Sequence, residues 1–225
     1  VPLVEIVTEP DFESAKEVVE YLKKLQQIVR YLDASDADME KGNMRLEPNI
    51  SLRPCHPELV SGSDTSENKM PKQVRHDNEK LPKYKVEVKN INSFRFVDKA
   101  IGYEIKRQGE ILDSGKTPAQ ETMGWDEKKN QTVSQRIKEE ANDYRYFPEP
   151  DIPPIRFTQD QISKIKSQIG ELPDAKFERF KKQFSLTDYD TEILTREKPM
   201  AEFFEETVRV GKKHNVNSKQ IANFL

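Results

Sequence analysis

The chain has 225 residues, of which 34% are apolar and 34% are charged, and its mean hydropathy is −0.87. That length allows one large domain or two smaller ones with a buried core, while so polar a composition predicts that part of the chain stays solvated. The net charge of −3 excludes a general positive field for nucleic acid, and the single cysteine excludes a disulfide framework and a cysteine-rich zinc site. No apolar run approaches the roughly 18 residues of a membrane span, so we expect no membrane contact and a cytoplasmic location, where any RNA contact needs a local basic surface.

The two ends of the sequence are unusual for a complete protein. Residues 1–7 alternate enough to predict a strand, with a turn in the following "TEPD", and there is no initiator methionine. The last residues, "NSKQIANFL", fall inside an apparent helix. We expect the chain to be an internal piece of a longer protein.

A helix is predicted after the first turn. Ser14 and Glu17 form a capping box, and helical spacing up to about Asp33 is kept by Val18, Leu22, Leu25, Val29 and Leu32. Such an apolar stripe indicates a helix that packs on a core and carries no chemistry.

Two strands with alternating side chains follow, one on each side of a long polar segment. In "MRLEPNISLRP", residues 44–54, apolar and polar residues alternate, and Pro48 favours an edge position or a bulge because it has no N–H to donate. In "LPKYKVEVKNINSFRFV", residues 81–97, Tyr84, Val86 and Val88 alternate with charged residues. We expect the two strands to pair and their apolar face to pack on two amphipathic helices.

The segment between the strands, residues 55–80, lacks periodicity and predicts a flexible insertion. Its Cys55, His56 and His76 could be imagined as metal ligands, but solvated loop residues are the better interpretation.

The rest of the chain changes character near residue 157. A helix is predicted from an N-cap at Asn92-Ser93 to Gly115, then a hairpin around "DEKKNQ" in "ETMGWDEKKNQTVSQRIKE", then the proline-spaced segment "NDYRYFPEPDIPPI". Short helices are predicted at 158–169, 173–184, 187–195, 199–213 and from 217 onward. We therefore expect an α+β domain over residues 1–156, with an antiparallel sheet packed against amphipathic helices, and an all-helical domain over residues 157–225.

The polar faces of the two paired strands form the first candidate site. Together they carry Arg45, Glu47, Asn49, Arg53, Lys85, Glu87 and Lys89, with Asn90 just beyond. Carboxylate and amide oxygens are ligands that Mg²⁺ prefers, and the basic groups would neutralise phosphate charge. A charged face that is simply solvated is the alternative. The sequence has no glycine-rich phosphate loop and no Ser–His–Asp arrangement.

Aromatic residues interleaved with arginine form the second candidate site. Tyr144, Arg145 and Tyr146 lie in "DYRYFPEPD", and Arg136 lies a little upstream. Such residues can stack on the bases of a tRNA end, although a loop anchored into a core, with the arginine paired to a carboxylate, is the alternative.

Several strings resemble the GatB subunit of the bacterial tRNA-dependent amidotransferase. They are "VPLVEIVTEPD", "NISLRP", "VEVKNINSFRFV", "QET…WDE", "KEEANDYRYFPEPDIPP" and "LTREKPMAEFFEE", and the resemblance covers nearly the whole chain except residues 55–80. The resemblance implies that residues 1–156 are the C-terminal part of a catalytic cradle domain and that a helical domain begins after them.

The resemblance also implies a reaction. The GatB subunit binds misacylated Glu-tRNA(Gln) or Asp-tRNA(Asn) and, with ATP and Mg²⁺, phosphorylates the side-chain carboxylate. Ammonia released from glutamine by the amidase subunit displaces the phosphate, and a third, small subunit clamps the other two together. Carried over by motif, Glu87 in "VEVKN" would be a metal ligand and catalytic, with Lys89 beside it.

The sequence departs from the family at several points. Glu47 stands in "EPN" where the family commonly has the aspartate of "D-A-N", and the two charged strands are separated by a long insertion instead of a short loop. The family's upstream metal ligands and its C-terminal tRNA-binding tail are absent, so we expect this piece to be inactive alone. A non-catalytic tRNA-binding module and the archaeal-type subunit, which acts only on Glu-tRNA(Gln), stay open as alternatives.

Overall fold

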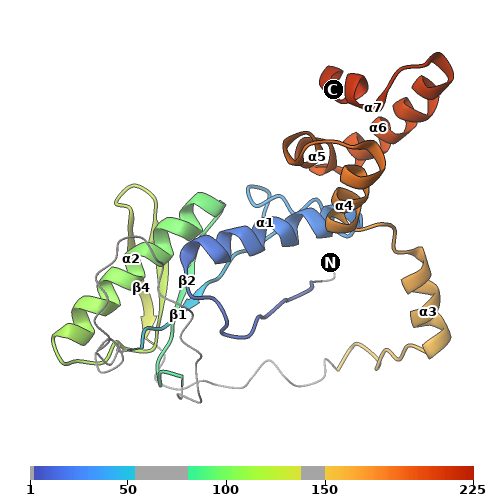
Figure 1. Ribbon diagram of the computed structural model, residues 1–225. Helices are drawn as coiled ribbons and strands as arrows, with labels where there is room; N and C mark the ends of the chain where they lie inside the picture. The colour runs from blue at the N-terminus through green and yellow to red at the C-terminus, as the bar shows by residue number, and fades with distance from the viewer. Residues whose placement is uncertain (1–2, 54–80, 138–149) are drawn as a thin grey trace, which may run out of the picture. The chain divides into compact units, whose positions relative to one another are not determined.

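The computed structural model describes residues 3–53, 81–137 and 150–225, without the side chains of residues 136 and 137 (Figure 1). The chain divides into two compact units, which are described separately below. The sheet unit is Leu46–Ala141, and the helical unit combines Val1–Arg45 with Asn142–Leu225. This division follows spatial contacts, and the sequence domains 1–156 and 157–225 stay a prediction.

The sheet unit contains four strands in the order β1-β2-β3-β4. They are β1 (Asn49–Ile50), β2 (Val86–Lys89), β3 (Glu121–Asp126) and β4 (Gln131–Ile137). With helices and a sheet in one chain, the α+β prediction is confirmed. The expected antiparallel sheet is wrong in one pairing, because β2 and β3 are parallel. A helix connects those two strands and returns the chain to the same end of the sheet, as parallel pairing requires.

The first charged strand is shorter than its alternation predicts. Only β1 and an isolated bridge between Leu46 and Ile91 pair within residues 44–53. Pro48 lies between them and cannot donate to the ladder, although its carbonyl accepts the N–H of Val88 at 2.9 Å. The alternation of burial is kept nonetheless, since Leu46 and Ile50 are buried and their polar neighbours are exposed.

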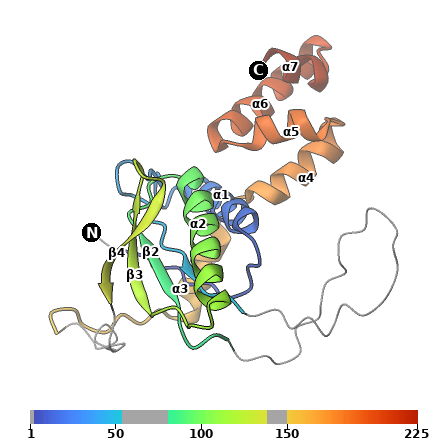
Figure 2. The same ribbon diagram turned by 90° about the vertical axis from the view of Figure 1, so that its left-hand side faces the viewer.

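Helix α2 (Phe94–Asp113) covers one face of the sheet (Figure 2). It begins as predicted, with the Ser93 hydroxyl accepting the N–H of Phe96, and it ends before Gly115, whose φ of +76° suits glycine at a helix end. Its apolar stripe includes Val97, Ala100 and Ile101, all buried. The buried face of the sheet contributes Val86, Val88, Met123 and Trp125 to the same core.

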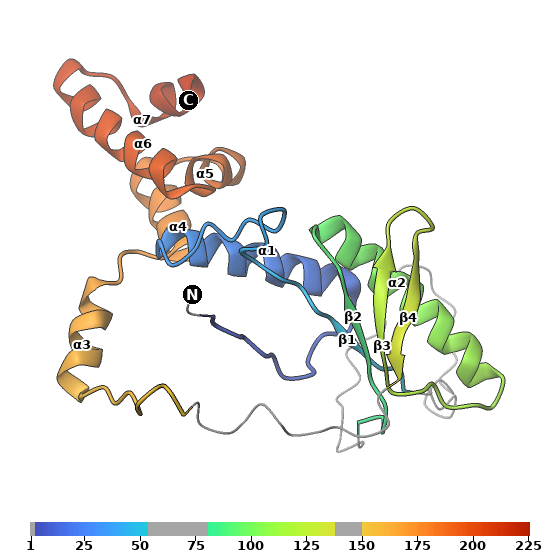
Figure 3. The ribbon, with the colours of Figure 1, turned by 180° about the vertical axis from the view of Figure 1, so that it is seen from behind.

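The predicted hairpin is confirmed as β3 and β4, which lie beside β2 (Figure 3). Their antiparallel register is regular from Asp126 back to Met123 and then shifts between Met123 and Thr122. This irregularity is a β-bulge on β4, and it lies at the end of the hairpin away from the turn.

The helical unit confirms the short helices predicted after residue 157. They are α3 (Gln159–Gln168), α4 (Pro173–Phe184), α5 (Asp188–Thr195), α6 (Lys198–Gly211), the 3-10 turn η2 (Lys212–His214) and α7 (Ser218–Phe224). Their core is centred on Phe180, Phe184 and Phe204, whose ring centroids lie 5.2–5.3 Å apart.

Helix α1 (Ala15–Tyr31) also belongs to the helical unit, and its predicted capping box is present. Its C-terminal end is joined to α5, where the Tyr31 hydroxyl donates to the Thr195 carbonyl at 2.5 Å and Gln27 donates to the same carbonyl at 3.0 Å. The expectation that this helix packs on the charged strands stays a prediction.

The predicted strand at residues 1–7 is wrong for the part that the structure describes. Residues 3–7 are extended but unpaired, and Leu3, Val4 and Val7 are at least 80% exposed. Alternation alone does not make a strand when no neighbouring strand is present to bond with it. Among the described helices, none is both long enough and apolar enough for a membrane span.

Candidate functional site

The exposed face of β2 and of residues 47–50 brings four of the predicted site residues together. Antiparallel pairing places Asn49 opposite Glu87, so the two polar faces join across the strand pair. The Lys89 ammonium lies 3.5 Å from a carboxylate oxygen of Glu87 and 3.6 Å from one of Glu47. The side chain of Glu87 is only 16% exposed, whereas those of Lys89 and Glu47 are 35% and 40% exposed.

Thr122 of β3 joins this group, and sequence reasoning missed it. Parallel pairing places Thr122 beside Glu87, and its hydroxyl donates to Oε2 of Glu87 at 3.2 Å. Glu87 is therefore held from both sides, by a cation on its own strand and by a hydroxyl on the next strand. Hydrogen bonds of this kind fix the orientation of a carboxylate before a ligand arrives.

Two amide side chains lie over Gly124, next to this group. A Cβ on Gly124 would lie 2.3 Å from Nε2 of Gln135 and 3.3 Å from Nδ2 of Asn90. Gly124 is the parallel partner of Lys89, and Asn90 follows with a left-handed φ of 61°. The missing side chain of Gly124 thus lets polar groups approach the strand beside Lys89.

The remaining predicted site residues do not join the group around Glu87 and Lys89. Lys85 is exposed just before β2, and Arg53 is half-buried after β1. Arg45 is exposed and belongs to the helical unit, outside this geometry. Arg136 is near the end of β4, where its register partner is Thr122. Tyr144, Arg145 and Tyr146, like Cys55, His56 and His76, lie outside the described residues.

The chemistry of the converging side chains fits a divalent cation held with phosphate. Within the described ranges no three His, Cys, Asp or Glu side chains are grouped to hold a metal ion by themselves. Two carboxylates do converge on one cation, the Lys89 ammonium. Mg²⁺ is commonly held by one or two carboxylates, with phosphate and water as its remaining ligands. Glu47 and Glu87 fit that donor set.

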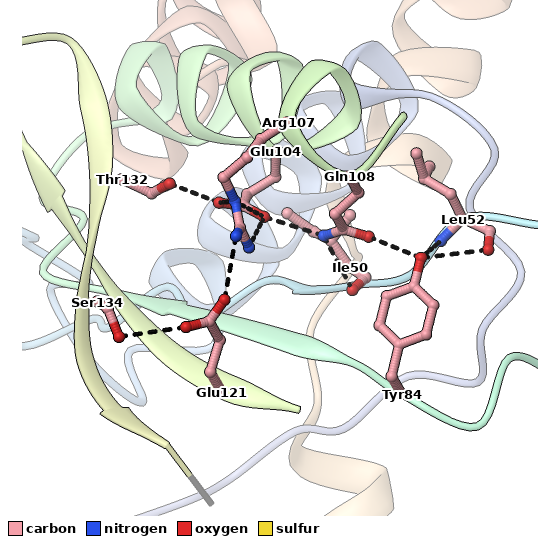
Figure 4. Close-up of polar contacts among 9 residues, drawn as sticks. All are labelled: Ile50, Leu52, Tyr84, Glu104, Arg107, Gln108, Glu121, Thr132 and Ser134. Carbon is pink, nitrogen blue, oxygen red and sulfur yellow. Dashed lines mark hydrogen bonds and ion pairs between the residues drawn. The ribbon is translucent and has the colours of Figure 1, made fainter. Parts of the chain in front are cut away.

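A second polar cluster lies between α2 and the strands (Figure 4). Glu104 is fully buried, and its carboxylate accepts from Arg107 at 2.9–3.2 Å, from Gln108 at 2.9 Å and from the Thr132 hydroxyl. Arg107 also pairs with Glu121 at 3.1 Å. The Ser134 hydroxyl donates to Glu121 at 3.1 Å. We call Glu104, Arg107, Glu121 and Ser134 the α2–sheet network.

The charge of Arg107 is stabilised by its partners. Burial opposes the charge of the guanidinium, but the hydrogen bonds and charges of Glu104 and then Glu121 outweigh burial and raise the Arg107 pKa. The sequence did carry a signal for this network, because Glu104 and Gln108 lie on the same helical stripe as the buried Val97, Ala100 and Ile101.

Comparison with known proteins matches residues 1–163 to the family model described as the GatB/GatE catalytic domain. The chain belongs to this family. It is 46% identical over 225 residues to the GatB subunit of the aspartyl/glutamyl-tRNA(Asn/Gln) amidotransferase of Thermodesulfovibrio yellowstonii. It is 48% identical over 224 residues to that of Persephonella marina and 46% identical over 225 residues to that of Thermosipho melanesiensis.

In each comparison the whole chain is covered, but it spans only 42% of the relative's length. The relatives are named as subunits of an amidotransferase, so the expected family is confirmed. The alignments leave the roles of Glu47, Glu87 and Lys89 as predictions.

Proposed function

We propose that this chain acts within the GatB subunit of a tRNA-dependent amidotransferase. The reaction is ATP- and Mg²⁺-dependent phosphorylation of the side-chain carboxylate of Glu-tRNA(Gln) or Asp-tRNA(Asn), followed by amidation with ammonia from glutamine. The names of the relatives support the family role. The observation that carries the chemistry is the convergence of Glu47, Glu87 and Lys89 on one sheet face.

Each side chain of this group has a role in the proposed reaction. Glu87 and Glu47 would hold Mg²⁺, which when bound stabilises negative charge on the phosphate oxygens. Lys89 is close enough to exchange its contact with the two carboxylates for one with a transferred phosphoryl group. The other predicted basic and amide groups, Arg45, Asn49, Arg53, Lys85 and Asn90, would bind the phosphates of ATP.

The partners proposed for the whole protein follow from the same family role. They are the amidase subunit and the small subunit of the heterotrimeric amidotransferase, together with the misacylated tRNA. Arg136, Tyr144, Arg145 and Tyr146 would contact the tRNA end by stacking and by charge, which is how single-stranded ends are bound.

The test removes the charge of Glu87 and keeps its size. In the intact enzyme, Glu87→Gln should lower ATP cleavage that depends on Glu-tRNA by at least about a hundredfold, as expected when a group stabilising transferred charge is lost. Phosphate release is measured with ATP, Mg²⁺ and Glu-tRNA(Gln). Glu110→Gln, at an exposed position of α2, makes the same charge change away from the site.

Unchanged phosphate release in Glu87→Gln would contradict the metal role. If wild-type enzyme bound Glu-tRNA without cleaving ATP, a non-catalytic tRNA-binding module would be the better proposal.

A further inference from the structure

The bulge in β4 determines which residue lies beside the candidate site. Thr122 is opposite Arg136 and Met123 is opposite Ser134, so Gln135 is the extra residue between them. Without the bulge, Gln135 would be the register partner of Thr122. Because strand residues alternate between faces, a shift of one position exchanges the residues that the two faces present. Bulges next to active sites re-aim side chains in this way.

A hydrogen bond spans the bulge on the face covered by α2. The Ser134 hydroxyl donates to Oε2 of Glu121 at 3.1 Å. Ser134 lies on one side of the extra residue, whereas the register partner of Glu121, Ile137, lies on the other. Glu121 is 9% exposed, so its carboxylate is largely shielded from water, whereas Ser134 is exposed.

A residue of helix α2 binds the same carboxylate. Nη1 of Arg107 lies 3.1 Å from Oε1 of Glu121, while its Nε and Nη2 donate to Glu104. Glu104 in turn accepts from Thr132, two residues before Ser134 on β4 (Figure 4). Through Arg107 the helix binds Glu121 of β3, and through Glu104 it binds Thr132 of β4. These contacts fix the two strands relative to each other where the bulge begins.

The α2–sheet network is one residue away from the candidate site. Glu121 and Thr122 are neighbours in β3, and they point to opposite faces of the sheet. Glu121 is bound underneath by Ser134 and Arg107, while Thr122 donates to Glu87 above. A shift of the backbone at Glu121 would therefore move the hydroxyl that orients Glu87.

We propose that Glu121 and Ser134, anchored by Arg107 and Glu104, are positioning residues for the candidate site. They hold the β4 bulge, and through it they set the register beside Thr122 and the orientation of Glu87. This inference rests on the proposed function of Glu87. A network of two carboxylates and one guanidinium is also a poor choice for stability alone, since apolar side chains of similar volume often pack as well or better.

The experiment removes the hydroxyl that spans the bulge. In the intact amidotransferase, Ser134→Ala should lower kcat/KM for Glu-tRNA-dependent ATP cleavage by about ten- to a hundredfold, the size expected for a small misplacement of reacting groups. The Mg²⁺ concentration for half-maximal rate should rise as well. Ser134→Thr keeps a hydroxyl at this position and should restore most of both values.

The matched control is Ser114→Ala, which removes a hydroxyl that bonds within α2, to the Ile111 carbonyl. It should keep the wild-type rate and Mg²⁺ dependence. A Ser134→Ala enzyme that behaves like this control would overturn the proposal. So would a loss of rate that only follows a loss of folded protein, measured by circular dichroism at the assay temperature.

A second variant and a parallel measurement complete the test. Glu121→Gln keeps the shape of the side chain but removes the charge facing Arg107. Like Ser134→Ala, it should raise the Mg²⁺ concentration for half-maximal rate, and it still tests the proposal if Ser134→Ala fails to fold. Wild-type Mg²⁺ dependence in Glu121→Gln would count against the proposal. Glu87→Gln is measured beside both. If Glu87→Gln is active, the proposed function fails; if it is inactive while Ser134→Ala and Glu121→Gln are normal, only the positioning role fails.

Discussion

Tyr31 shows how one hydroxyl joins two distant parts of the helical unit. It is 5% exposed at the end of α1 and donates to the carbonyl of Thr195, 164 residues away. Burial, and then the negative charge of Glu171, raises the pKa of Tyr31 to about 12. The phenol therefore stays protonated and keeps donating at neutral pH.

Removal of this hydroxyl should have a modest cost. Tyr31→Phe should lower the free energy of unfolding by about 0.5–1.5 kcal/mol, the usual net value of one hydrogen bond. The cost stays modest because Gln27 also donates to the Thr195 carbonyl, which is not left unbonded. Urea unfolding measures the change, and Tyr189→Phe, at a residue that is 72% exposed, is the control. Equal effects of the two substitutions would contradict this account.

The site residues differ in how far the sequence could predict them. Strict alternation in one strand is enough to put Glu87 and Lys89 on a polar face, and the pairing with Asn49 followed from two such strands. Thr122 could not be found this way, because its place beside Glu87 depends on parallel register set after the long helix α2. Glu104 was missed for the opposite reason, since a carboxylate is rarely expected on a buried stripe.

Charged side chains connect whole elements in the helical unit. Arg179 of α4 donates to Glu171 at 2.6 and 2.8 Å and pairs with Glu205 of α6 at 2.6 Å. Lys176 of α4 lies 2.9 Å from Glu205 as well. The hydrogen bond from Arg179 lowers the pKa of Glu171 from its ordinary value of 4.5. The cluster therefore connects α4, and Glu171 two residues before it, to α6.

This cluster should make the helical unit sensitive to acid. Because the pKa of Glu171 is lower in the folded chain, its contribution to stability is present above its ordinary value of 4.5 and is lost as pH falls through the folded pKa. Glu171→Gln should therefore be less stable than wild type near neutral pH, and the difference should shrink below that value. Urea unfolding across pH measures this difference, with Glu192→Gln on α5 as an exposed control. A difference that stays constant with pH would contradict the argument.

Helices were easier to predict than strands for a physical reason. A capping box such as Ser14 with Glu17, and a glycine such as Gly115 after the last turn, mark helix ends within a few residues of sequence. A strand exists only where a neighbour bonds to it. Alternation thus predicted more strand than is present at residues 3–7, which have no ladder partner among the described residues, and around Pro48, which has no N–H to donate.

On the scale of the whole molecule, each of the two compact units has a core of its own. In the helical unit, the residues clustered around Phe204 all come from α4–α7 and the loops between them. In the sheet unit, Val86 and Val88 of β2 are fully buried. Because the chain of 225 residues has two cores, a substitution can lower the stability of one unit without changing the stability of the other.

Phe204→Ala should reveal this separation. Phe204 is fully buried and touches the rings of Phe180 and Phe184, so its truncation should cost the helical unit about 3–5 kcal/mol. Amide hydrogen exchange should speed up across α4–α7, while the amides of Val86 and Val88 keep their protection. Phe203→Ala, next in sequence but 57% exposed, should change neither region. Equal loss of protection in β2 and in α4–α7 would mean that the two cores unfold as one, because cooperative units exchange together.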